Sequence, residues 1–168
     1  MMRAFRSEPD GTLSAELTTD EVAILVDLAG QLSDLLQQGS STDDAVRRLL
    51  PDAYPDDPAA SAEFKHFTSA GLVDRKVATA SVILTTLRES VAADTDADVD
   101  IETPTLLRLD RQAAAAWLTA VGDLRLVIAE RLGIVRDGDE GEPGAVMTEI
   151  YDWLGYVQGS LVDALDAA

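Results

Sequence analysis

Apolar residues recur every three or four positions through most of this chain, and that spacing restricts it to a mainly helical fold. Gly39 and Gly133 mark two helix ends, because glycine readily adopts the backbone that stops a helix. Thr18 or Thr19 and Asp110 are suited to cap helix starts. The pattern predicts a bundle of five to six helices, with helices over residues 18–38, 43–50, 58–91, 110–132 and 145–167 and a break in the third near Thr68 or Ser69.

Strand signals are confined to two short stretches. Leu13, Ala15 and Leu17 alternate with polar residues, which is the period of a strand, and Pro9-Asp10-Gly11 is a turn sequence. The sequence therefore predicts a small N-terminal β-hairpin over 1–17, and three leucines suggest a third short strand near 105–109. No repeat or break in composition divides the 168 residues, so we expect one domain over 1–168 with the helical bundle over 18–168.

Each long helix has a face that should point into the core. In the third helix the expected core residues are Val73, Val77, Ala80, Leu84, Leu87 and Val91. In the last helix they are Val146, Ile150, Trp153, Leu154, Val157, Leu161 and Leu165.

The chain has no cysteine and a single histidine, His66. It therefore has no disulfide, no thiolate nucleophile, no cysteine-based redox sensing and no multi-histidine metal site. The acidic residues from Asp94 to Asp100 lack the glycine and glutamate that an EF-hand calcium loop needs, so we expect a solvated loop over 92–104. We expect no catalytic, cofactor-binding or metal-binding residues. An enzyme or small-ligand binder of unknown class is an alternative.

The formal net charge is −18, and it is unevenly distributed. Residues 8–44, 89–103 and 137–168 contain acidic but no basic side chains, whereas 45–88 and 104–136 are close to neutral. Such a charge repels phosphate backbones, so we expect no nucleic-acid partner. No apolar run is long enough to span a membrane or to form a signal peptide, so we expect a cytoplasmic protein without membrane contact.

Several basic residues nevertheless permit a DNA-binding alternative. The short helix at 43–50, its connector and the next helix loosely imitate a helix-turn-helix, although the connector is too long and too rich in proline. The hairpin would then imitate a wing. The candidate DNA contacts are Arg3, Arg6, Arg47, Arg48, Lys65, Arg75 and Lys76.

Three stretches of the sequence are distinctive: Ala53-Tyr-Pro-Asp-Asp-Pro-Ala-Ala-Ser-Ala-Glu-Phe64, the segment from Ala116-Trp-Leu-Thr to Arg131-Leu-Gly-Ile134, and Tyr151-Asp-Trp-Leu154. They resemble an actinobacterial family long catalogued as a domain of unknown function and now labelled the oxidative stress regulator, or AosR-like, family. Gly122 departs from the family pattern, which has asparagine there. The absence of cysteine excludes the thiol-based sensing that the family label suggests.

The resemblance implies a transcription-associated regulatory protein. The leading hypothesis is a non-enzymatic regulator that acts by protein–protein contact, possible partners being transcription-machinery proteins. The alternative is a sequence-specific DNA-binding transcriptional regulator. A homodimer is also considered, because positions 25/28/32/35 and 150/154/157/161 approach heptad spacing. Among the positions that match the family, the candidate partner-binding residues are Tyr54, Phe64, Trp117, Asp123, Arg125 and Trp153.

Overall fold

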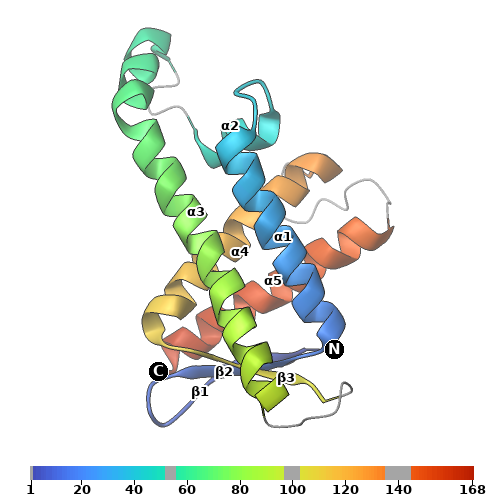
Figure 1. The fold of residues 1–168 in the computed structure, drawn as a ribbon. Coiled ribbons are helices and arrows are strands. Elements are labelled where there is room, and N and C mark those ends of the chain that lie inside the picture. Colours follow the sequence, from blue (N-terminus) through green and yellow to red (C-terminus); the bar gives the residue numbers. More distant parts are fainter. Residues whose placement is uncertain (1, 52–55, 97–102, 135–144) are drawn as a thin grey trace.

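The computed structural model describes residues 2–51, 56–96, 103–134 and 145–168, and shows a mainly α fold with a small sheet at one end (Figure 1). Within these residues there are five helices and three strands. In chain order they are β1 (Arg3–Ser7), β2 (Leu13–Leu17), α1 (Thr19–Gln38), α2 (Asp44–Leu49), α3 (Pro58–Asp96), β3 (Thr105–Leu109), α4 (Arg111–Leu132) and α5 (Ala145–Asp166). The predicted fold class, including the third strand, is confirmed.

The sheet has the order β1-β2-β3 and both pairings are antiparallel. Gly11 closes the hairpin with a positive φ of 82°, and the Asp10 side chain accepts a hydrogen bond from the Thr12 backbone N–H at 2.9 Å. In the central strand, Leu13 lies opposite Leu109. The hairpin is therefore joined to a strand that follows α3 in the chain.

The helix ends match their sequence signals. Thr18 and Glu21 form a reciprocal capping box at the start of α1, and Asp110 caps α4 through the backbone N–H of Ala113. Gly133 ends α4 in the left-handed conformation, with φ of 71°. Because these caps satisfy backbone groups locally, the limits of α1 and α4 could be predicted from short sequence patterns.

The core is built around Trp117 on α4. Its side chain is fully buried, and its ring lies edge-on to Phe5 of β1 with 6.0 Å between centroids. The indole Nε1 donates a hydrogen bond to Thr86 Oγ1 of α3 at 3.0 Å. Trp117 thus joins the sheet, α3 and α4 in one contact. α4 also packs against α1, α2 and α5, so it is the central helix.

Of the helices in the described residues, only α4 is long and apolar enough to cross a membrane by length and composition. It carries nine buried residues that belong to the chain's own packing, among them Trp117, Val121 and Leu124. This is the pattern of a core helix.

Three predictions about the helices were wrong. α3 continues through Thr68 and Ser69 without a break and extends to Asp96, so residues 92–96 are helical and not part of the predicted acidic loop. Residues 97–102 lie outside the described residues. Val91 and Val146, predicted to face the core, are 41% and 68% exposed. Each lies close to one end of its helix, where none of the other described elements covers the continuing apolar face.

Candidate functional site

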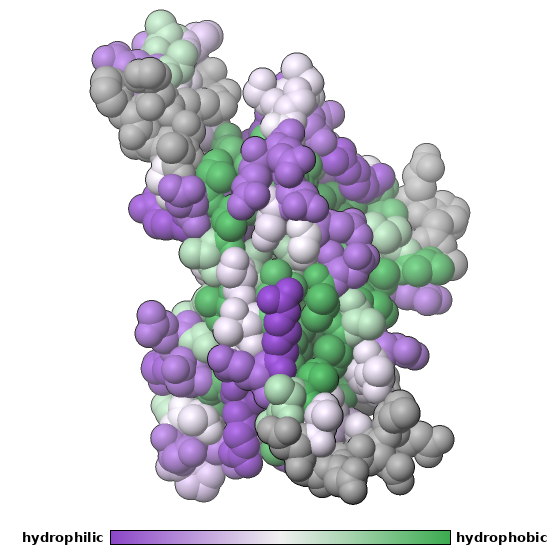
Figure 2. Space-filling model, viewed as in Figure 1, coloured by the Kyte–Doolittle hydropathy of each residue, from purple (hydrophilic) through white to green (hydrophobic). Residues whose placement is uncertain are grey.

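A groove of about 390 Å³ opens between α1, α4 and the first turn of α5. Its floor consists of Leu32 on α1 and of Leu124 and Ile128 on α4, all nearly buried. Half-buried Leu28, Leu35 and Val127 form its walls. Figure 2 shows hydrophobic surface beside α1 and at the start of α5, with hydrophilic surface around it. Below, we call these residues, with Gln31, Asp34, Arg131 and Met147, the α1–α4 groove.

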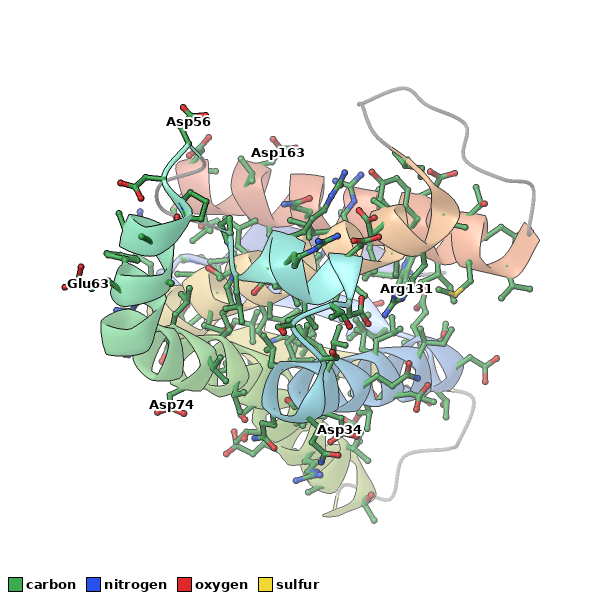
Figure 3. The ribbon with its side chains drawn as sticks, turned by 90° about the horizontal axis from the view of Figure 1, so that it is seen from above. Asp34, Asp56, Glu63, Asp74, Arg131 and Asp163 are labelled. Atoms are coloured by element: carbon green, nitrogen blue, oxygen red, sulfur yellow. The ribbon has the colours of Figure 1, made fainter. Side chains whose placement is uncertain are left out.

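The rim of the groove is acidic on the α1 side. α1 carries four acidic residues and no lysine or arginine. Asp34 and Gln31 are exposed at the rim, and Gln31 donates a hydrogen bond to Asp27 at 2.7 Å. Figure 3 shows Asp34 on α1 and Arg131 on neighbouring α4.

The positive charge of Arg131 is already matched. Its guanidinium donates to both carboxylate oxygens of Asp43, the residue that caps α2, at 3.0 and 2.7 Å. These hydrogen bonds hold the pKa of Asp43 below its ordinary value of 3.8 and raise the pKa of Arg131. The groove therefore presents apolar walls and net negative charge.

Met147 and Val146 extend this apolar surface onto α5. Met147 lines the groove and is 38% exposed, and Val146 beside it is 68% exposed. Met147 therefore continues the apolar lining of the groove onto α5, whereas Val146 is exposed next to it and does not line the groove.

Most of the candidate DNA contacts are paired with carboxylates. Arg48 lies 2.6 Å from Glu130 on α4, and Arg47 pairs with Asp44. On the hairpin, Arg3 lies 3.2 Å from Glu16, and Arg6 lies within 4 Å of Glu8 and Glu16. Arg75 is exposed, and no ion pair is formed by it within the described residues. The side chain of Lys65 lies outside the described part of the structure.

Lys76 pairs with Asp123, a candidate partner-binding residue. The Lys76 ammonium donates to both carboxylate oxygens of Asp123, at 2.8 and 3.0 Å, and joins α3 to α4. Only 17% and 11% of the two side chains are exposed. Two residues assigned from sequence to different roles thus form one interhelical contact.

The other candidate partner-binding residues differ in their exposure. Trp117 is buried in the core, Phe64 is 46% exposed near the start of α3, and Trp153 is half-buried on α5. In Figure 1 the first turns of α3 project beyond the rest of the bundle. Tyr54 lies outside the described residues. Among the described residues, buried Trp117 and exposed Phe64 therefore do not share one binding surface.

Arg125 joins α4 to α5 without a carboxylate. Its guanidinium lies 4.5 Å from the ring centroid of Tyr151, and its Nη1 donates to Gln158 at 2.8 Å. Gly155 lies beneath it, where an added Cβ would be 3.3–3.5 Å from the guanidinium. Within the described residues no acidic side chain reaches Arg125, although the chain has 31 acids against 13 bases.

Sequence reasoning missed the α1–α4 groove. The heptad spacing puts Leu28 and Leu35 in a dimer seam together with Leu25 and Leu32. In the structure Leu25 and Leu32 are buried in the chain's own core. The same holds for Leu154, Val157 and Leu161 on α5. The sequence does carry one signal for the groove. Val146 and Met147 are adjacent exposed apolar residues in the first turn of α5, and they continue its apolar face beyond the turns that other helices cover.

Comparisons with known proteins place the chain in a family. The family profile described as Domain of unknown function (DUF2017) matches residues 2–165. The Putative oxidative stress regulator AosR of Mycobacterium leprae (strain TN) is 33% identical over an alignment of 185 positions that covers 88% of this chain and 79% of that protein. The Oxidative stress regulator AosR of Mycobacterium tuberculosis (strain ATCC 25618 / H37Rv) is 28% identical over 186 residues, with the same coverage.

No solved structure gives a significant match. The family profile matches residues 2–165 and the relative from Mycobacterium leprae covers 88% of the chain, so both matches extend over most of it. The chain belongs to the DUF2017 family, in which it is similar to mycobacterial proteins named oxidative stress regulators.

Proposed function

We propose that this protein is a non-enzymatic, cytoplasmic regulator that binds a partner protein in the α1–α4 groove. The observation that carries the proposal is the groove itself, with leucine and valine walls and an exposed methionine at its mouth. Such walls bind apolar side chains and supply no acid or base for catalysis. The names of the mycobacterial relatives support a regulatory role.

The proposed occupant is an amphipathic helix of a partner protein, with apolar anchors on one face and lysine or arginine beside them. The groove runs between two helices, which is the usual setting for a helix laid into an apolar channel. The charge of the groove argues for basic flanks, because α1 has only acidic charged side chains and Arg131 is paired with Asp43. We propose that this partner belongs to the transcription machinery.

A fluorescent peptide tests the groove directly. The probe is an 18-residue helical peptide of leucine and lysine with its leucines on one face, and its control has the same composition with leucines spread around the helix. We expect the amphipathic peptide to bind more tightly in fluorescence anisotropy at 0.15 M salt. Val127→Glu should weaken this binding at least about tenfold, because it places a carboxylate against the peptide's apolar face.

Val162→Glu is the matched control. Val162 is 40% exposed on α5 and does not line the groove, so the same substitution there adds the same charge without touching the proposed contact. Equal effects of the two substitutions, or equal binding of the two peptides, would contradict the proposal. A gel shift of duplex DNA at low salt that Val127→Glu leaves unchanged would instead favour the DNA-binding alternative.

A further inference from the structure

The sulfur atoms of this chain are all in methionine, since it has three methionines and no cysteine. Met1 lies outside the described residues. Met2 is 4% exposed, and its backbone N–H donates to Glu21 Oε1 at 2.6 Å, which ties that residue to the start of α1. Met147 is 38% exposed. Within the described residues, Met147 is therefore the sulfur that solvent reaches.

Because of its position, oxidation of Met147 would change the surface of the α1–α4 groove. It lines the α1–α4 groove together with Leu28, Leu35 and Val127. An unoxidised thioether is apolar and deformable, and suits the surface of an apolar channel. A sulfoxide is a polar hydrogen-bond acceptor, and burying it against apolar side chains leaves it without a donor.

We propose that Met147 is an oxidation site whose conversion to the sulfoxide weakens binding in the α1–α4 groove. The oxidant is a peroxide. A sulfur lone pair attacks one oxygen of hydrogen peroxide, the S–O bond forms as the O–O bond breaks, and the second oxygen leaves as hydroxide, which takes the proton from the transferred oxygen to become water. The thioether is oxidised by two electrons and hydrogen peroxide is reduced by two. Methionine sulfoxide reductases reverse this reaction, so the site returns to its apolar form.

The assignment of Met147 as the oxidation site depends only on its exposure. The effect of its oxidation on binding rests on the proposed function. The first experiment therefore measures only the chemistry. The folded protein is treated with hydrogen peroxide, and oxidation at each methionine is followed by peptide mapping with tandem mass spectrometry. We expect Met147 to be oxidised at least about tenfold faster than Met2, because burial shields Met2 from the oxidant.

Unfolding supplies the control for that comparison. In concentrated guanidinium chloride both sulfurs are exposed, and the two rates should become similar. Equal rates in the folded protein, or faster oxidation of Met2, would overturn the assignment of Met147 as the oxidation site.

The second experiment measures the consequence with the amphipathic peptide described above. Peroxide treatment should weaken peptide binding roughly fivefold in the wild-type protein. Met147→Leu, compared with itself before and after peroxide, should show no loss, and Met147→Gln should imitate the oxidised protein without peroxide. Met2→Leu should respond to peroxide as the wild type does.

The outcomes separate this inference from the proposed function. If the untreated wild type does not bind the peptide, the groove proposal fails, and the effect of oxidation on binding fails with it. If Val127→Glu weakens binding but peroxide does not, the groove proposal stands and the oxidation proposal is overturned. Loss of binding on oxidation in Met147→Leu would also overturn it.

Discussion

Lys76 on α3 and Asp123 on α4 form a shielded ion pair, in which the ammonium donates to both carboxylate oxygens at 2.8 and 3.0 Å. Removing one partner leaves the other charge in a site with little access to water. We expect Asp123→Leu or Lys76→Met each to lower the free energy of unfolding by roughly 2–4 kcal/mol, measured by urea denaturation. The double variant Lys76→Met/Asp123→Leu should recover much of that loss.

Arg75→Met is the control for Lys76→Met, because Arg75 is an exposed neighbour on the same helix and makes no ion pair within the described residues. Its stability should stay within about 0.5 kcal/mol of the wild type. If the double variant is as unstable as the sum of the single ones, the two residues do not act as a pair.

The hydrogen bond between Trp117 and Thr86 predicts that removing the Thr86 hydroxyl lowers the free energy of unfolding. Thr86→Val keeps the shape of the side chain but leaves the buried indole N–H without its acceptor. We expect a loss of about 1–3 kcal/mol in urea unfolding followed by tryptophan fluorescence. Thr95→Val is the matched control. Both threonine hydroxyls donate to a backbone carbonyl one turn earlier in α3, but Thr95 is exposed near the end of the helix. Equal losses would show that the indole contact contributes nothing.

The pair between Asp43 and Arg131 predicts a pH dependence. Because the pKa of Asp43 is lowered in the folded protein, its contribution to stability is full above the ordinary value of 3.8 and disappears as the pH falls through the folded value. Asp43→Asn retains a residue that caps helices well but removes this titration. The difference in melting temperature between wild type and Asp43→Asn should be constant from pH 5 to 8 and shrink below about pH 4.

The same pH dependence should become weaker when the other partner is removed, because the backbone hydrogen bonds from Ala45 and Val46 lower the pKa of Asp43 less than Arg131 does. Arg131→Gln takes away the guanidinium that lowers the pKa of Asp43. A thermal melting series that shows the acid-dependent loss unchanged in Arg131→Gln would contradict the assigned cause.

Arg125 and Tyr151 offer a test of a cation–π contact between α4 and α5. The guanidinium carbon lies 4.5 Å from the ring centroid, and the arginine is half-buried. A double-mutant cycle of Arg125→Met and Tyr151→Leu should give a coupling energy of about 0.5–2 kcal/mol in denaturant unfolding. The coupling should persist at 1 M salt, because the ring screens one face of the cation from solvent. A coupling near zero would mean that the two residues only happen to be adjacent.

The sequence predicts local features of this fold well. Asp110 and Gly133 delimit α4, and Pro9-Asp10-Gly11 identifies the hairpin, because caps and turns depend on a few adjacent residues. The predicted break at Thr68 or Ser69 is wrong because these hydroxyl residues are tolerated within a helix as well as at its start.

Features that depend on contacts between distant segments could not be predicted. Lys76 and Asp123 are 47 residues apart, and no sequence pattern around either residue indicates that it pairs with the other. The α1–α4 groove exists only because two helices leave a channel between half-buried side chains. Periodicity shows that Leu28 and Leu35 are apolar and share a face with core residues, but not that they stay at the surface.

The order of strands in the sheet has a consequence for folding. β2 is the central strand, and one of its edges is paired only when β3 arrives about 90 residues later, after α3. Until then the hairpin presents an open edge, and β1 still lacks α5, which packs against it. A growing chain therefore cannot complete its sheet while the ribosome is still making α3. Chaperones that shield exposed strands would have the longest access to this protein at its first seventeen residues.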